Sequence, residues 1–256
     1  GRGREPCGGG DVVMMWRLAW LELKVLVRDP LTWVFSLGLP LLALLGVGFI
    51  LGNDPEPDRF GGLGAVDYYV PAYVIMVVAA FAWVSVPRHI AAYRERGILR
   101  RYRAAGMSPW PLLMAFGLIV VVLAAVTSLA FATLVGLLFG VSLPNTLWLV
   151  IIGFLVAAVA FAAVGITLGV MLPSARVAEV VGVVLWFALL VVGGAGVPRQ
   201  ELTVAMQRVQ DATPVWHAVQ TLQDAWFGMD AGASWLALLG LLVVGVATAS
   251  LTFRLE

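Results

Sequence analysis

The chain has 256 residues, of which 61% are hydrophobic and 12% charged, and its net charge is +1. The charged share is about half of that in ordinary soluble proteins, and a soluble domain of this length has no means of burying so much apolar surface. The composition therefore excludes a soluble globular domain and predicts an all-α integral membrane protein, because a bilayer can cover the apolar side chains. The single cysteine, Cys7, also excludes an internal disulfide and a cysteine metal cluster.

Two segments precede the first apolar run. Residues 1–10 (GRGREPCGGG) are predicted to be a flexible cytoplasmic tail, and residues 11–29 an amphipathic helix in the membrane interface. The apolar residues of this helix recur at three- and four-residue steps: Val12, Met15, Trp16, Ala19, Trp20, Leu23 and Val27. A plain cytoplasmic extension of the first span is the alternative interpretation. Pro30 is expected to end or kink the helix before that span.

Residues 30–256 are predicted to form one transmembrane domain of six helices. Each apolar run reaches the roughly 20 residues that a hydrocarbon core of about 30 Å requires. The predicted spans are about 31–51, 69–87, 112–138, 147–172, 180–198 and 234–253. The fourth carries Gly165 and Gly169 four residues apart, a spacing of small residues that lets helices approach closely.

The charged residues are segregated by the side of the membrane on which they fall. If the first thirty residues are cytoplasmic, that side holds 13 basic and 7 acidic residues, and the other side holds 3 basic and 8 acidic residues. This positive-inside asymmetry predicts a multi-pass protein with both termini in the cytoplasm. Because the basic excess is local to cytoplasmic loops, it does not indicate a nucleic-acid partner. The use of 15 arginines and one lysine suggests a GC-rich bacterial genome, and hence the bacterial cytoplasmic membrane.

Several kinds of chemistry are missing from the sequence. A Walker A loop needs a lysine after a Gly-rich turn, and the only lysine, Lys24, lies in a segment without glycine, so the chain is not expected to be an enzyme. His89 and His217 are predicted to lie on opposite sides of the membrane, where they cannot share a metal ion. No predicted span carries an ionisable residue near its centre, which argues against a proton- or ion-coupled carrier. Glu179 is the nearest case, and we expect it to pair with Arg176, three residues earlier, rather than to relay protons.

The loop of residues 87–111 carries six arginines and one glutamate. It could simply set the topology, or it could bind anionic lipid head groups. Its pattern is more ordered than either role requires: the run from Ile90 continues the second span as a helix, and Gly97 allows a turn. A second short helix follows, with an apolar edge of Ile98, Leu99 and Tyr102 among Arg100, Arg101 and Arg103. A short basic amphipathic helix below the membrane is typical of a docking element for a soluble partner.

Five stretches, taken in order, resemble one family. They are RDPLTWVFSLGLPLL (28–42), VPAYVIM (70–76), YRERGILRRYRAAGMSPW (93–110), GGAGVP (193–198) and DATPVWHAVQTLQDAWFG (211–228). The chain is similar to permeases of the type-2 ABC exporter family, which includes drug-resistance (daunorubicin-permease-like) and polysaccharide export permeases. It departs from the family pattern at Ala72, where Gly is common, and at Thr213, where Asn is common.

The resemblance implies a division of labour between chains. A separate cytoplasmic ABC ATPase, which would hold ATP and Mg, is expected to dock under the helix of residues 98–105, the coupling helix. The residues implied in coupling are Arg94, Glu95, Arg96 and Gly97 as a transmission hinge, followed by Ile98, Leu99, Arg100, Arg101, Tyr102 and Arg103. No cofactor or metal is expected in this chain. The family usually works as a dimer of six-span subunits, so a second permease subunit, identical or different, is an expected partner. Membrane lipid is the other expected partner.

The same resemblance implies that the second and fifth spans line a substrate path between the subunits. In this chain those spans carry Phe81, Trp83, Trp186 and Phe187, well inside the membrane. Packing against lipid or neighbouring helices is the alternative role for these aromatic side chains. Residues 199–230 are amphipathic and are expected to form an external re-entrant helical segment that caps the exit.

An apolar, aromatic and charge-free path suits lipophilic cargo. We therefore expect the permease subunit of an ATP-driven exporter that moves a lipophilic or amphipathic small molecule, drug or lipid out of the cell. Export of a lipid-linked polysaccharide is the alternative within the family. A membrane carrier, lipid enzyme or scaffold outside the ABC class is the alternative beyond it.

Overall fold

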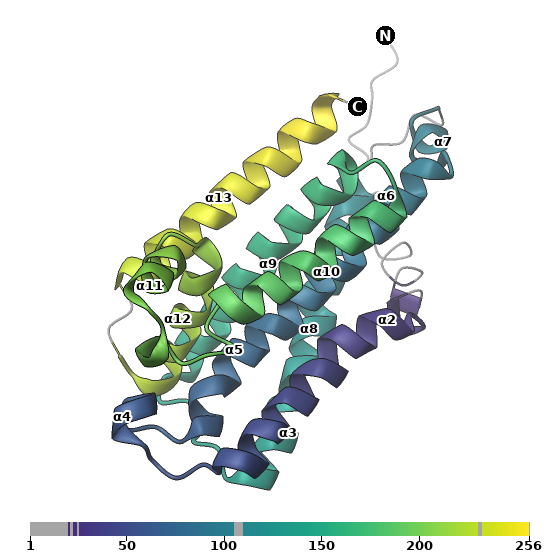
Figure 1. Ribbon diagram of the computed structural model, residues 1–256. Coiled ribbons are helices and arrows are strands. Elements are labelled where there is room, and N and C mark those ends of the chain that lie inside the picture. The colour runs from purple at the N-terminus through teal and green to yellow at the C-terminus, as the bar shows by residue number, and fades with distance from the viewer. Residues whose placement is uncertain (1–19, 21–22, 25, 105–109, 230–231, 256) are drawn as a thin grey trace.

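The computed structural model describes residue 20 and residues 23–24, 26–104, 110–229 and 232–255 (Figure 1). The regular elements of this part of the chain are all helices, and six of them are long and apolar enough to cross a membrane. This confirms the all-α membrane class. The predicted tail and most of the predicted interfacial helix lie outside the described residues, although residues 20, 23–24 and 26–27 are helical.

The first crossing helix consists of α2 (Pro30–Trp33), the π-helical segment η1 (Val34–Gly38) and α3 (Leu39–Leu51). Pro30 stands in its first turn, where its missing N–H costs no helical hydrogen bond. The Asp29 carboxylate caps the same end by accepting from the Leu31 backbone N–H at 3.3 Å. The chain therefore breaks before Pro30, and the helix covers the residues of the predicted span 31–51.

The second crossing helix lies at the centre of the bundle. It consists of α5 (Ala65–Ala79), the π-helical segment η2 (Ala80–Ser85) and α6 (Val86–Glu95), and every residue of α5 and η2 is buried. The helix starts four residues before the predicted span and runs on to Glu95, as the pattern from Ile90 predicts. The short helix α4 (Pro57–Phe60) precedes it. The short helix α7 (Ile98–Ala104) follows it, and the next described element is α8 (Trp110–Phe139), the third crossing helix.

The remaining crossing helices are α9 (Leu147–Met171), α10 (Ala175–Val192) and α13 (Gly232–Leu255). The prediction of 180–198 for the fifth span was wrong in position, because α10 begins five residues earlier and ends six residues earlier. Its start is fixed by Ser174, whose hydroxyl accepts from the Val177 backbone N–H at 3.2 Å. It ends at Gly193 and Gly194, because the φ of +78° at Gly194 is incompatible with a right-handed helix.

Close glycine contacts hold the fourth and fifth helices against the second. A Cβ on Gly165 would overlap the carbonyl oxygen of Ala82, and a Cβ on Gly182 would overlap that of Trp83. A Cβ on Gly169 would lie 2.8 Å from the Cβ of Ile90. The Gly165–Gly169 pair therefore serves the close approach that its spacing predicts, and the neighbour is the second helix.

The two ends of the bundle differ in what they carry (Figure 1). Helix α7 and the end of α13 lie at one end, called here the α7 end. Helices α4, α11 (Val204–Asp211) and α12 (Pro214–Phe227) lie at the opposite end, called the α12 end. The short 3₁₀ segment η3 (Arg199–Glu201) precedes α11, and α12 packs against α5, α9 and α13. The described residues 199–229 thus form three helical stretches, as the predicted helical character requires; their depth in a membrane stays a prediction.

Candidate functional site at the α6–α7 corner

The corner between α6 and α7 is a sharp turn centred on one glycine. Helix α6 ends at Glu95, Arg96 follows, and Gly97 has a φ of +68°, in the left-handed region that side chains other than glycine rarely adopt. No atom outside the turn would lie within 4 Å of a Cβ on Gly97, so the requirement for glycine is conformational rather than steric. The turn that the sequence predicts at Gly97 is confirmed.

Arg94, the second-last residue of α6, caps the end of the fourth crossing helix. Its guanidinium donates hydrogen bonds to the carbonyl oxygens of Val170 and Leu172, at the C-terminal end of α9. The last carbonyls of a helix have no partner within the helix and carry partial negative charge. A cation at this point therefore satisfies polar groups that would otherwise face the edge of the membrane.

Glu95, the next residue, caps the start of the fifth crossing helix. One of its carboxylate oxygens accepts from the backbone N–H of Ala175, the first residue of α10, at 3.3 Å. An anion is favoured at the positive end of a helix. Two adjacent side chains of opposite charge thus hold the two helix ends that face each other across residues 172–175. We call this pair the Arg94–Glu95 clamp.

A second set of contacts joins α6 to the first and fifth helices. Arg88 on α6 is hydrogen-bonded to the Asp29 carboxylate, and it also lies 3.8 Å from Glu179 on α10. The hydroxyls of Thr32 and Ser85 lie 2.9 Å apart. The predicted partner of Glu179 was wrong, because packing brings α6 against α10 and places Arg88, rather than Arg176, within ion-pair distance of that carboxylate.

The described part of α7 is amphipathic, as predicted. Leu99 is buried against the bundle, Ile98 is half-buried, and Arg100 and Arg101 are exposed. The side chains of Tyr102 and Arg103 lie outside the described residues, as does the predicted Gly-Met-Ser-Pro end of the helix. Two arginines therefore face away from the membrane helices at a corner that is clamped to α9 and α10.

The four aromatic residues assigned to a substrate path fall into three separate groups of ring contacts. Trp186 is 1% exposed, donates its indole N–H to the Met76 carbonyl at 3.1 Å, and touches Phe187 edge to face at 5.2 Å between ring centroids. Trp83 lies against Phe161, with centroids 4.5 Å apart. Phe81 meets the edge of Trp33 at 6.3 Å.

The four rings differ in how exposed their side chains are. Phe187 is 48% exposed, whereas Phe81, Trp83 and Trp186 are buried within this chain. The Trp83 indole N–H is buried without a hydrogen-bond partner among the described residues. The assignment of all four to a path stays a prediction, and the structure brings only Trp186 and Phe187 together.

Sequence reasoning missed a polar network at the α12 end. Asp67 at the start of α5 accepts from the backbone N–H and the hydroxyl of Ser142, at 2.8 and 3.1 Å, and from the Asn53 amide at 3.3 Å. The indole N–H of Trp226 donates to the Ser142 carbonyl at 2.9 Å. This network joins two interhelical connections, the start of α5 and α12. The only signal in the sequence was a set of polar residues next to predicted span ends.

No group of three metal-ligating side chains occurs in the part of the chain that the structure describes. His89, on α6, lies 2.8 Å from the Ser85 carbonyl through its Nδ1, and His217, on α12, lies 3.0 Å from the Asp211 carbonyl through its Nε2. The two helices lie toward opposite ends of the bundle (Figure 1). The histidines are therefore too far apart to share an ion.

The chain matches a known family. The profile described as "ABC-2 type transporter" matches residues 14–227. That range contains the α6–α7 corner, the Arg94–Glu95 clamp, the four aromatic residues and α12. No curated protein matches the chain.

Proposed function

The chain belongs to the ABC-2 type transporter family, and we propose that it is the permease subunit of an exporter driven by a separate ATPase chain. The family domain is a membrane component, and six apolar helices make the chain a multi-pass membrane protein.

The observation that carries the proposal is the Arg94–Glu95 clamp. A soluble partner that pushes on α7 acts on the corner at Gly97, and the clamp joins that corner to the ends of α9 and α10. Helices transmit displacement because their backbone hydrogen bonds keep them stiff, and packed interfaces switch between discrete arrangements. In this proposal, ATP binding to the partner moves α7, and the fifth helix moves with it.

Charge supports the orientation of the subunit. The α7 end carries Arg88, Arg94, Arg96, Arg100, Arg101 and Arg176 among its described residues, together with only a few carboxylates. By the positive-inside rule this end faces the cytoplasm, where an ATPase would be. A membrane-impermeant maleimide should then label Cys7 only after permeabilisation, and a Val204→Cys substitution on α11 should be labelled in intact cells.

The cargo proposed is a lipophilic or amphipathic molecule. The crossing helices present apolar side chains almost throughout, and no ionisable side chain of the described residues lies near the centre of a crossing helix. A second permease subunit would complete the path by facing exposed apolar residues such as Phe187 on α10. A dimer of permease subunits with two ATPase subunits is therefore the proposed assembly, in a bacterial cytoplasmic membrane.

Affinity purification of the tagged chain from its own membranes tests the proposal. The wild-type chain should bring down a protein that hydrolyses MgATP, and the double substitution Arg100→Glu/Arg101→Glu should remove most of that activity. The matched control is Arg28→Glu/Arg176→Glu, which makes the same charge change at the same end but away from α7. Retention of the ATPase by the α7 variant, or equal loss in the control, would contradict docking at α7.

A further inference from the structure

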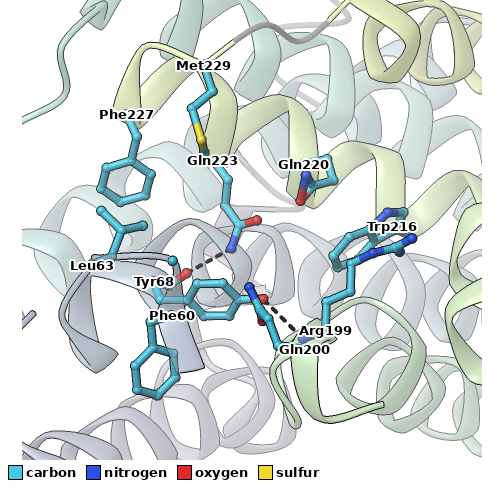
Figure 2. Close-up of a pocket in the computed structure, with 11 residues that line it drawn as sticks. Phe60, Leu63, Tyr68, Arg199, Gln200, Trp216, Gln220, Gln223, Phe227 and Met229 are labelled. Atoms are coloured by element: carbon cyan, nitrogen blue, oxygen red, sulfur yellow. Dashed lines mark hydrogen bonds between the residues drawn. The ribbon is translucent and has the colours of Figure 1, made fainter. Parts of the chain in front are cut away.

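A pocket of about 350 Å³ opens at the α12 end, far from the α6–α7 corner. Its walls come from three parts of the chain: the connection between α4 and the start of α5, the η3 segment, and α12 with its end (Figure 2). Phe60, Leu63, Trp216 and Phe227 supply apolar surface. A volume of this size fits a small molecule, and pockets for such ligands combine an apolar lining with a few polar groups.

The polar groups of the pocket other than Arg199 are uncharged, and several of them can form further hydrogen bonds. Gln223 is 5% exposed, and its amide N–H donates to the Tyr68 carbonyl at 2.9 Å, while its amide oxygen has no donor among the described residues. The Gln220 amide likewise has no hydrogen bond within the described chain. The Tyr68 hydroxyl accepts from the Arg199 backbone N–H at 3.4 Å and keeps its own hydrogen for donation. Figure 2 shows the Gln223 amide directed at Tyr68.

The one charged residue in the lining is already paired. Arg199 lies 2.9 Å from the Asp211 carboxylate and stacks over the Trp216 ring at 5.2 Å. The hydrogen bond from Arg199 lowers the pKa of Asp211 below its usual value, so both partners are charged at neutral pH. An ionic ligand would find no unpaired opposite charge in the pocket. Desolvating its charge would therefore be costly.

We propose that this pocket binds a neutral amphipathic molecule whose polar part carries hydroxyl groups. A hydroxyl both donates and accepts, and so does a glutamine amide, so the free groups of Gln220 and Gln223 match neighbouring hydroxyls. The rings of Phe60 and Trp216 cover the apolar part of the ligand. Taken with the proposed function, on which this point rests, the pocket lies on the outer face and is a site that cargo occupies before release.

Cysteine protection in the full-length chain, held in lipid nanodiscs without any ATPase, tests the site. In a Cys7→Ser background, Met229→Cys places the reporter in the lining, where Met229 is 52% exposed. Val204→Cys is the control, since Val204 is 65% exposed on α11 and lies outside the lining. The probes are octyl glucoside, octyl sulfate and octyltrimethylammonium, each below its micelle concentration.

Octyl glucoside should slow maleimide labelling of the Met229→Cys reporter several-fold and leave the Val204→Cys control unchanged. The two charged probes should protect little, and Gln220→Leu should remove most of the glucoside effect. No protection by the glucoside would overturn the proposal, and so would equal protection by all three probes or stronger protection by the sulfate. The experiment needs neither ATP nor a partner. The result of cysteine protection can therefore be interpreted even if the α7 docking test fails. Labelling of Met229→Cys in intact cells checks the orientation separately.

Discussion

Three charged side chains at the α7 end cap helix ends. Asp29 caps the first crossing helix, Arg94 the end of the fourth and Glu95 the start of the fifth. Arg94 and Glu95 could be named from the sequence because their motif resembles a family. Their partners could not, because Val170 and Ala175 lie 76 and 80 residues away in the chain and only packing brings them near.

Asp67 offers a test of a residue that sequence reasoning missed. Both of its carboxylate oxygens accept hydrogen bonds, so Asp67→Asn would turn an NH₂ group toward a donor. Leaving a buried donor or acceptor unpaired costs about 1–3 kcal/mol. The thermal midpoint of the purified chain should fall by several degrees. The control Asp58→Asn, at an exposed position with no hydrogen bond to the described residues, should leave the midpoint unchanged; equal midpoints for both variants would show that the network is dispensable.

The aromatic path can be tested best at Phe187. Trp186→Ala would leave a cavity in a fully buried site at a cost of about 3–5 kcal/mol, so lost transport there would report lost folding. Phe187 is half-exposed, and Phe187→Ala should keep the fold while changing the efflux of a size series of neutral lipophilic dyes several-fold, in line with about 0.5–1.5 kcal/mol per aromatic contact. Phe49→Ala, on the exposed face of α3, is the control. Efflux that is unchanged for every dye would assign Phe187 to packing.

Apolar runs in the sequence located all six crossing helices. How well the helix ends were predicted depended on capping residues, prolines and glycines near each end. The first span was predicted well because Asp29-Pro30 marks its start. The fifth was misplaced because the charged residues Arg176 and Glu179 favoured a later start, although both lie in the first two turns of α10. The Ser174 cap and the Gly193-Gly194 pair are the features that mark its true ends. The π-helical segments η1 and η2 have no sequence signal that we recognise.

Close packing of α10 on the second helix predicts a sharp difference between two glycines. Gly182→Ala would drive a methyl group into the Trp83 carbonyl oxygen, a backbone atom that cannot move aside alone. We expect Gly182→Ala to lower the free energy of unfolding by about 1–3 kcal/mol, the usual cost of overpacking. Gly136→Ala on α8 meets no atom within 4 Å and should be neutral or slightly stabilising. Thermal unfolding followed by size-exclusion chromatography checks both variants, and a Gly182→Ala midpoint at or above that of Gly136→Ala would contradict this packing.

At the scale of the whole molecule, the class, the number of crossing helices and the family followed from the sequence. Composition and charge are reliable guides to the class of a membrane protein, because few kinds of secondary structure can span a lipid bilayer. Two features needed the structure: the clamp at the α7 end and the pocket at the α12 end, each built from residues far apart in the chain. In the two proposals, the ends of the bundle have separate roles: the α7 end receives the movement of the partner, and the α12 end binds a ligand.

In the proposed mechanism, movement of α7 reaches the fifth helix through the Arg94–Glu95 clamp. Val177, an exposed residue in the first turn of α10, can report this movement as Val177→Cys in a Cys7→Ser background, with the ATPase bound. We predict that a non-hydrolysable ATP analogue changes the maleimide labelling rate several-fold when Glu95 is present. Glu95→Gln, which keeps an oxygen acceptor for the Ala175 N–H, should retain the change, whereas Glu95→Ala should lose it with the ATPase still bound. A change that persists undiminished in Glu95→Ala, or that is absent with Glu95 intact, would contradict the account.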